Sequence, residues 1–303
     1  MWNEHTVHWL SAMLLCAVFT GTCVAGSSPS LREQLSARQC DRYTPATTQQ
    51  LQQAEAAFVA LLQAPAAVDA AAASNWQALG YRLQHVSDGE AGWWLLQQPQ
   101  DQCSGQGLYL VRQDAVAAVA VQIPHGYFDL YTDDIGAGLL QAPVRVMAFN
   151  TARRHFTRHG HTVDADVAHR GDSYFVALTR AFARVFPSGR LLQLHGFNAA
   201  KRTSAAGRSA AAIISNGSDM PSTASLAVAA CLQALPVGAV RLYPRDVREL
   251  GATRNVQGRR LRAYGHEGFV HVELNRGLRE QLRDDDSLRA DFAACLGSGV
   301  PTP

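Results

Sequence analysis

Two histidines of this chain each follow an apolar, strand-like segment, and each is followed by glycine. His125 comes after the apolar run 116–123 and Pro124, and His195 comes directly after the run 191–194. A glycine at the next position lets the backbone turn sharply and lets a ligand approach closely. Imidazoles at one edge of a sheet are suitable zinc ligands, so the pattern predicts that His125 and His195 bind a metal ion.

A carboxylate is expected as the third ligand, because a catalytic zinc ion commonly has about three protein ligands and one water. Asp129 is the preferred residue, since it lies four positions after His125 in the turn before a helix. The sequence thus predicts one Zn²⁺ per chain. Three other carboxylates remain alternatives: Asp133, Asp134 and Asp166. A single histidine at a strand end can also be a structural residue that is satisfied by hydrogen bonds.

A second carboxylate lies inside the apolar segment 269–275, where strand alternation puts His271 and Glu273 on one face. Burying a carboxylate on a strand costs free energy unless it has a partner or a task. In a zinc hydrolase that task is to move a proton from the attacking water to the leaving nitrogen. We therefore predict that Glu273 is catalytic. The alternatives are a solvent-facing glutamate on an edge strand and one paired with an arginine.

Arginines near the expected sheet edge are candidates for substrate binding, because a guanidinium can bind a carboxylate through two parallel hydrogen bonds. Arg153 and Arg154 follow the apolar run 144–149. Arg254 and Asn255 lie on a loop and form a second candidate pair. The preference for arginine is also explained by composition, since Lys201 is the only lysine of the chain. The polar segment 164–172 is either support for a metal ligand or a solvated loop that caps a helix.

The elements that must position these residues follow from hydrophobic periodicity. Helices are expected at 46–64 and 66–79, and strands at 81–86, 93–98 and 108–112. From residue 116 onward, strands alternate with helices. The expected strands of this part are 116–123, 144–149, 191–194, 211–214, 240–243 and 269–274.

This order predicts an α/β fold, an open and mostly parallel sheet with helices on both faces. Residues 26–115 are expected to form N-terminal helices and a hairpin, and residues 116–303 the catalytic core of the same single domain. In such sheets ligands bind beyond the carboxyl ends of the strands. That rule also draws attention to the strand-end segments 150–154 and 215–217.

Composition and the N-terminus indicate an exported globular protein. The chain has 303 residues, 47% of them hydrophobic, and a net charge of +2, which gives no indication of nucleic-acid binding. Residues 1–25 resemble a signal peptide, with a short apolar run at 9–18 and small residues before Gly26. The run is too short for a comfortable membrane span, so no stable span is expected after cleavage. A periplasmic or extracellular location follows, with an uncleaved anchor or a lipoprotein at Cys23 as alternatives.

Four cysteines remain after the expected cleavage, and an even number in an exported chain suggests two disulfides. Three pairings are possible. We favour Cys40–Cys103 and Cys231–Cys295, which link the N-terminal part and the last helices respectively. None of these cysteines has the close spacing of a metal or redox site, so they are interpreted as structural.

The residues around the two histidines and Glu273 resemble those of the N-formylglutamate amidohydrolases and, more broadly, of the zinc-carboxypeptidase superfamily. The resemblance covers roughly 116–283 and is carried by Val-Gln-Ile-Pro-His-Gly at 121–126, by His-Gly at 195–196, and by the segment 268–276. It implies a mixed, mostly parallel sheet with one zinc at its edge and hydrolysis of amide bonds beside a carboxylate. It also implies that His125 and His195 are zinc ligands, that Glu273 is general base and acid, and that Arg153 or Arg154 binds substrate. Carboxypeptidases place a glutamate three residues after the first histidine, where this chain has Phe128.

These observations together predict an exported zinc-dependent amidohydrolase or carboxypeptidase-like enzyme. Its substrate would be a small molecule or peptide with a carboxylate, such as a peptide, a cell-wall fragment or an N-acyl amino acid. The main alternative is a non-catalytic binding protein on the same fold with a degenerate metal site. A metal-free structural protein of the cell envelope is a third interpretation. The sequence contains no GxSxG, P-loop, dinucleotide-binding or HExxH motif, which argues against the enzyme classes that depend on them.

Overall fold

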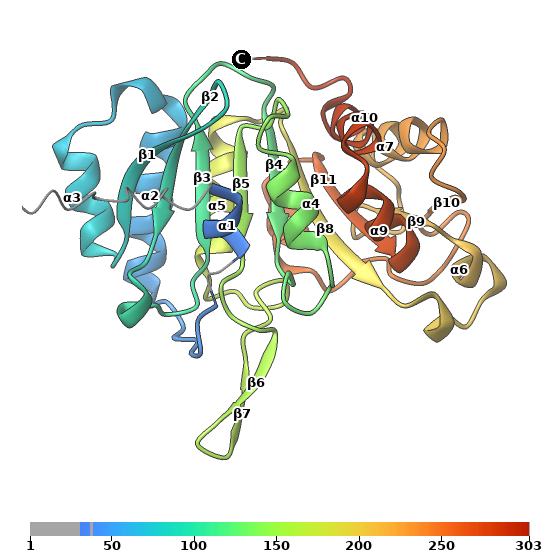
Figure 1. Cartoon of the computed structure of the whole chain (residues 1–303), viewed down its shortest axis with the longest axis horizontal. Coiled ribbons are helices and arrows are strands. Elements are labelled where there is room, and N and C mark those ends of the chain that lie inside the picture. The colour runs from blue at the N-terminus through green and yellow to red at the C-terminus, as the bar shows by residue number, and fades with distance from the viewer. Residues whose placement is uncertain (1–30, 37–38, 303) are drawn as a thin grey trace, which may run out of the picture.

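A nine-stranded sheet runs through the whole molecule, with helices on both of its faces (Figure 1). The computed structural model describes residues 31–36 and 39–302, so the expected signal peptide at 1–25 lies outside the described residues. The strands follow the order β1-β2-β3-β5-β4-β8-β11-β9-β10 across the sheet. A separate two-stranded ribbon is formed by β6 and β7.

The strands of the main sheet are β1 (Arg82–Asp88), β2 (Ala91–Gln97), β3 (Leu108–Arg112), β4 (Val119–Ile123), β5 (Val146–Phe149), β8 (Arg190–Phe197), β9 (Ala212–Ser215), β10 (Val240–Leu242) and β11 (Phe269–Asn275). The ribbon consists of β6 (His155–Arg158) and β7 (His161–Asp164). The α-helices are α1 (Leu31–Ser36), α2 (Thr48–Gln63), α3 (Ala70–Ala78), α4 (Thr132–Gly138), α5 (Tyr174–Val185), α6 (Ala205–Ser209), α7 (Thr223–Gln233), α8 (Val256–Ala263), α9 (Arg276–Asp284) and α10 (Asp286–Gly297). Three short 3₁₀ segments are η1 (Pro65–Ala67), η2 (Gln100–Gln102) and η3 (Ala199–Lys201).

The sheet is mixed, which corrects the expectation of a mostly parallel sheet. Strands β5, β4, β8 and β11 are mutually parallel and occupy the centre. The N-terminal strands β1, β2 and β3 add to this centre in antiparallel fashion, and β9 runs antiparallel to β11. The parallel part therefore forms the central block, and it is this block that carries both histidines and Glu273.

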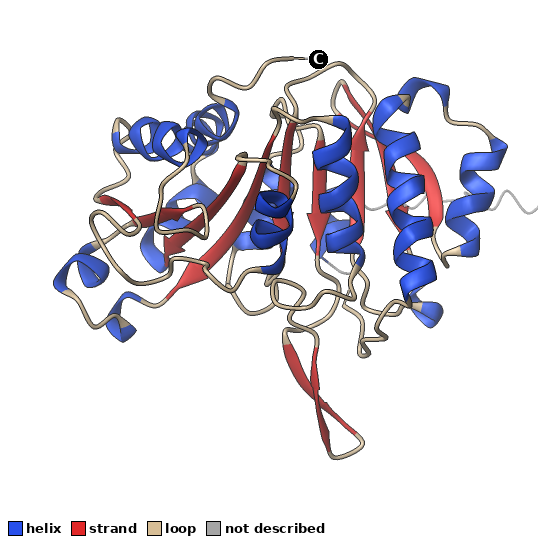
Figure 2. Cartoon of the chain, turned by 180° about the vertical axis from the view of Figure 1, so that it is seen from behind, coloured by secondary structure: helices blue, strands red, loops and turns tan. Residues whose placement is uncertain are grey.

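Two hydrophobic cores lie on opposite faces of the sheet and explain why its central strands are apolar throughout. Along β4, Val119, Val121 and Ile123 face the first core, and Ala120 faces the second, as does Ala118 just before the strand. The first core is closed by α1, α4, α7, α9 and α10, and the second by α2, α3, α5 and α8, as the two opposite views show (Figures 1 and 2). Burial on both faces requires continuous apolar runs.

The N-terminal part is joined to the rest by strand pairing, and each of the two parts contains a disulfide. β3 pairs with β5 along its length, so the sheet is continuous from the N-terminal hairpin to the central block. The disulfides Cys40–Cys103 and Cys231–Cys295 are both formed, as favoured from the sequence. Among the described residues, no helix is long and apolar enough to cross a membrane.

The ribbon of β6 and β7 projects from the body at the lower edge of the sheet in Figure 1, below the carboxyl end of β5. Its turn uses left-handed backbone at His159 (φ 49°) and Gly160 (φ 78°), as expected for a tight two-residue hairpin turn. This ribbon was not predicted from the sequence. Its strands are mostly exposed and polar, so they lack the apolar alternation on which strand prediction depends.

Candidate metal centre

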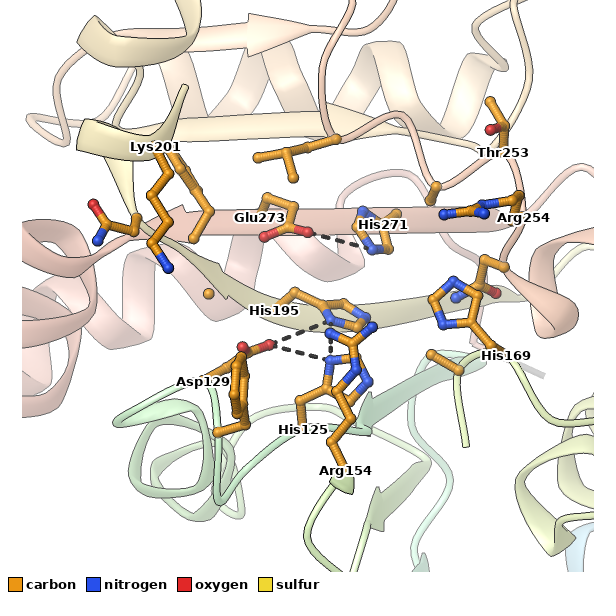
Figure 3. A pocket seen from close by; sticks show the side chains of 18 of the residues that line it. His125, Asp129, Arg154, His169, His195, Lys201, Thr253, Arg254, His271 and Glu273 are labelled. Atoms are coloured by element: carbon orange, nitrogen blue, oxygen red, sulfur yellow. Dashed lines mark hydrogen bonds and ion pairs between the residues drawn. The ribbon is translucent and has the colours of Figure 1, made fainter. Parts of the chain in front are cut away.

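Three neighbouring parallel strands bring the candidate residues to one edge of the sheet. His125 follows the end of β4, His195 lies near the end of β8, and Glu273 lies near the end of β11. In the register of β8 and β11, His195 is directly opposite Glu273. All three side chains are buried and surround one cavity (Figure 3). The parallel arrangement thus gathers residues that are up to 148 positions apart in the sequence.

Asp129 reaches the same point through a tight turn that follows His125. The backbone N–H groups of Phe128 and Asp129 both donate to the carbonyl of His125, at 2.8 and 2.7 Å. This turn directs the carboxylate of Asp129 back toward the His125 ring and leaves Phe128 outside, with 67% of its surface exposed. Asp129, four residues after His125, is therefore the residue that contacts the histidine ring, whereas Phe128, three residues after it, lies outside.

The donor atoms of this triad converge on one point. His125 Nδ1 and His195 Nδ1 are 3.1 Å apart, and each lies 3.4 Å from Asp129 Oδ2. At zinc bond lengths of about 2.0–2.1 Å, tetrahedral ligand atoms are about 3.3–3.4 Å from one another. The three separations match this spacing, and the donor set of two imidazoles and one carboxylate is one that zinc accepts in catalytic sites.

The outward nitrogens of both imidazoles have acceptors. His125 Nε2 lies 2.9 Å from Asp166 Oδ1, and His195 Nε2 lies 3.4 Å from Gln193 Oε1. A proton on each Nε2 leaves the Nδ1 lone pairs directed at each other and at the Asp129 carboxylate. Three electron-rich atoms in contact at a buried site repel one another unless a positive charge lies among them. The residues therefore fit a cation.

Burial and mutual contacts shift the pKa values of all three triad residues. Burial lowers the pKa of His125, but hydrogen bonds with Asp129 and Asp166 outweigh it and raise this pKa to about 9. Burial lowers the pKa of His195 to about 4. Burial also opposes ionisation of Asp129, yet its hydrogen bonds with the two histidines hold its pKa well below the usual range. A positive charge at this point is thus favoured whether a proton or a metal ion supplies it.

Glu273 lies beside the triad with one oxygen that has no hydrogen-bond partner among the described residues, Oε2. Burial raises its pKa to about 8, and the nearby charge of Asp129 adds to the effect. One ligand atom each of His195, His271 and Glu273 lie within 4.8 Å of one another, so a single water can reach both Glu273 and the metal centre. His271 was not predicted as a site residue from the sequence, although its alternation with Glu273 on β11 was the available signal.

The glycines after the two histidines leave room for buried charged side chains. A Cβ at Gly126 would collide with the carboxylate of Asp133, and a Cβ at Gly196 would collide with the guanidinium of Arg279. Burial raises the pKa of Asp133 to about 7. Among the predicted alternatives to Asp129, Asp133 packs against the turn and Asp166 contacts the outer nitrogen of His125, whereas Asp134 is exposed.

A cavity of about 430 Å³ opens over this centre. Its wall includes four basic side chains, from Arg154, Lys201, Arg202 and Arg254. Arg153 is exposed and does not line the cavity. The remaining lining residues are His125, Phe128, Asp129, Ala168, His169, His195, Gly196, Phe197, Asn198, Leu250, Ala252, Thr253, Asn255, His271 and Glu273.

The loop with Arg254 and Asn255 is fixed by hydrogen bonds within the protein. Asn255 Oδ1 accepts from the backbone N–H of Gly258 and so caps α8, and its amide nitrogen donates to Gln193 Oε1 at 2.6 Å. Both ends of the Asn255 side chain are therefore occupied, and Arg254 is the member of the pair that is exposed toward the cavity. The other predicted strand-end segment, 215–217, does not line this cavity because β9 runs antiparallel to β11.

Comparison with known proteins gives distant structural similarities. No protein-family model matches the chain, and no curated protein sequence is significantly similar to it. A proposed metallopeptidase from Shewanella amazonensis SB2B is 13% identical, with a TM-score of 0.31 over 76% of this chain and 94% of the other. A second, from Shewanella denitrificans OS217, is 16% identical, with a TM-score of 0.31 over 76% of this chain and 91% of the other. The chemistry of the site therefore has to be inferred from its own geometry.

Proposed function

We propose that this protein is a zinc-dependent amidohydrolase that cleaves an amide bond next to a carboxylate. His125, Asp129 and His195 hold one Zn²⁺ per chain. The observation that carries the proposal is the convergence of three donor atoms, 3.1–3.4 Å apart, from two imidazoles whose outer nitrogens both have acceptors. A peptide, a cell-wall fragment or an N-acyl amino acid has the required amide and carboxylate.

Each side chain around the proposed centre has a separate role in the reaction. A zinc ion bound there supplies positive charge to the amide carbonyl and makes the attacking water more acidic. Glu273 accepts a proton from that water on its unpartnered oxygen and delivers it to the leaving nitrogen. Arg254 binds the substrate carboxylate from the cavity wall, and Asn255 fixes the loop that holds Arg254. Arg154 positions Asp166, to which its Nε lies 2.7 Å away.

The proposal also includes the organisation and location of the chain. We propose that the mature chain, 26–303, is a single domain; the pairing of β3 with β5, which continues the sheet from the N-terminal strands into the central block, supports this proposal. An exported location, periplasmic or extracellular, is supported by the two disulfides, since such bonds persist mainly in oxidising compartments.

The first experiment measures metal content and hydrolysis together. Purified protein and the variants His195→Ala and Glu273→Gln are dialysed and subjected to elemental analysis, and then supplied with a panel of N-acyl amino acids. We expect about one zinc per chain in the wild type, about one in Glu273→Gln, and loss of zinc in His195→Ala. Hydrolysis should be lost in both variants, because one lacks the ion and the other lacks the proton carrier.

The matched control is His161→Ala, which removes an exposed histidine of the β6–β7 ribbon and should change neither property. Circular dichroism establishes that each variant is folded. Folded wild-type protein that takes up no zinc would contradict the metal centre. Zinc binding with full activity in Glu273→Gln would contradict the assigned role of Glu273, and zinc binding without hydrolysis of any amide would favour the binding-protein alternative.

A further inference from the structure

The cavity over the metal centre has basic side chains with very different surroundings. Arg154 Nε lies 2.7 Å from Asp166 Oδ2, and Arg202 Nη1 lies 3.6 Å from Glu249 Oε2. Within the described part of the chain, the side chains of Lys201 and Arg254 have no hydrogen bond or ion pair with protein groups. Two of the four cations are thus neutralised by the protein itself, and two are left for a ligand.

The two unpaired cations lie at opposite ends of the cavity. In the view of Figure 3, Lys201 lies to the left of Glu273 and Arg254 to the right of His271, with His195 between the two cations. The carboxylates among the described lining residues are Asp129 and Glu273, which belong to the centre. A substrate whose amide lies over that centre therefore extends toward a positive charge in both directions.

Each of these cations is held by its own local structure. Lys201 ends η3, whose first turn is capped by the Asn198 side chain accepting from the N–H of Ala200 at 2.9 Å. Arg254 lies in a loop in which Leu250 (φ 58°) and Ala252 (φ 53°) adopt the left-handed conformation. Non-glycine residues adopt this conformation at a cost, and such strain is concentrated at functional sites. The backbone positions of Lys201 and Arg254 are therefore defined by local structure.

We propose that the substrate is a dianion with one anionic group on each side of the scissile amide, one bound by Lys201 and the other by Arg254. This inference rests on the proposed function and specifies its substrate class. Binding one carboxylate needs one of these cations only, so the second would remain unpaired in the cavity. A dianion neutralises both, and the charge at each end centres the amide between them.

The test uses three ligands that differ by one carboxylate at a time. N-Succinylglycine carries a carboxylate on both sides of its amide, N-butyrylglycine only on the amine side, and N-ethylsuccinamic acid only on the acyl side. Affinities are measured by titration calorimetry with zinc-loaded Glu273→Gln protein, so that no turnover disturbs the measurement. Further variants in the same background are Lys201→Met, Arg254→Met and the control Arg153→Met, an exposed arginine outside the cavity wall.

We expect the diacid to bind about 10–100-fold more tightly than either monoacid, the range of one hydrogen bond to a charged group. Lys201→Met should abolish the advantage given by one carboxylate, and Arg254→Met the advantage given by the other. Arg153→Met should retain both. This crossed pattern identifies one cation at each end.

Equal affinities for the three ligands, including no measurable binding of any, would overturn the proposal. Loss of the same carboxylate preference in both variants would also overturn it, because both cations would then act at one end. Since the readout is binding, the result is separate from the proposed hydrolysis. Crossed preferences in a protein that hydrolyses no amide would support the dianion site and contradict the proposed enzyme. Hydrolysis without crossed preferences would support the enzyme and contradict the dianion site.

Discussion

Asp166 links His125 of the proposed metal centre to two side chains outside that centre, His169 and Arg154. Its carboxylate contacts His125 Nε2 at 2.9 Å, His169 Nδ1 at 2.8 Å and Arg154 Nε at 2.7 Å, and it is buried. Such a carboxylate fixes the tautomer and orientation of a metal-binding imidazole and increases its basicity. In the proposed metal site, Asp166 is therefore a positioning residue for His125, because it contacts the ring nitrogen opposite the one that faces Asp129.

Replacement of Asp166 by asparagine should weaken zinc binding by about 10–100-fold, because an amide keeps the shape but loses the charge. The measurement is a competition titration against a zinc chelator at constant pH. Asp134→Asn, which changes an exposed carboxylate of α4, is the matched control and should have no effect. Unchanged zinc affinity in Asp166→Asn would show that Asp166 does not support the ligand.

His266 lies away from the metal centre and gives a prediction about pH. Its Nδ1 accepts from the N–H of Gly268 at 3.1 Å, and its Nε2–H donates to the carbonyl of Phe186 at 3.0 Å. Burial lowers its pKa, so the folded protein favours the neutral ring. In the unfolded chain the pKa is about 6.5. The stability contributed by His266 is therefore present above about pH 6.5 and is lost as the pH falls toward the lower folded pKa.

Urea unfolding of the wild type and of His266→Gln from pH 8 to pH 5 tests this sign. The stability difference between the two proteins should shrink as the pH falls below about 6.5, because only the wild type must release a proton on folding. Taking the difference removes the contributions of the other histidines. A difference that stays constant over this range would be inconsistent with a neutral, buried His266.

Residue chemistry allowed part of the site to be predicted from the sequence. His125 and His195 follow apolar runs whose ends must meet at the edge of a parallel block, and Glu273 lies inside a third such run. The structure brings these three residues and Asp129 together at one edge of the sheet, as predicted, while their roles stay a proposal. Two features could not be derived in this way. The contact of Asp166 with His125 joins positions 41 residues apart through an irregular loop, and Lys201 has no motif around it.

At the level of elements, the strained loop before α8 gives a separate prediction. Ala252 has φ 53° and lines the cavity two residues before Arg254. Glycine adopts this conformation without the steric penalty of about 1 kcal/mol, but it gives the unfolded chain more freedom. We expect Ala252→Gly to change the unfolding free energy by less than about 1 kcal/mol while loosening the position of Arg254.

The expected consequence is a higher KM with little change in kcat for the best N-acyl amino acid substrate. Ala205→Gly, at the start of α6 and outside the cavity wall, provides the control for a general effect of added glycine. A lower kcat at unchanged KM would contradict the view that this loop acts through Arg254 on binding.

The elements themselves were predictable where burial produces a clear pattern. Central strands such as β4 and β8 are continuous apolar runs because helices cover both of their faces. Strand direction was not predictable in the same way. The pattern of side chains in β9 gives no indication of whether the strand runs parallel or antiparallel to its neighbour. Its antiparallel pairing with β11 depends on how the chain returns through α6. The sheet is mixed rather than mostly parallel because of this pairing and because β1, β2 and β3 also pair in antiparallel fashion.

At the scale of the whole molecule, the projecting ribbon divides the chain into two parts. Arg158 is exposed at its tip, next to the turn formed by His159 and Gly160. Exposed loop tips are preferred sites of proteolysis. Brief treatment with trypsin should therefore cut first at Arg158, giving two fragments on a denaturing gel without reducing agent. Gel filtration of the cut protein under native conditions should still show a single species of unchanged size.

This result is expected because each disulfide lies within one part, Cys40–Cys103 before the cut and Cys231–Cys295 after it. The parts remain together through the pairing of β4 with β8. The variant Arg158→Gln should delay the cut. Early cleavage elsewhere, or separation of the fragments without denaturant, would argue against a ribbon that projects from an otherwise continuous sheet.

The position of this ribbon also means that the residues of the proposed metal centre come from two pieces of chain. His125 and Asp129 lie before the turn of the ribbon, and His195 and Glu273 lie after it. Neither half, produced by itself, contains a complete set of ligands. From the proposed function it follows that two separately expressed halves should bind zinc only after they reassociate, so that zinc binding would report the pairing of β4 with β8.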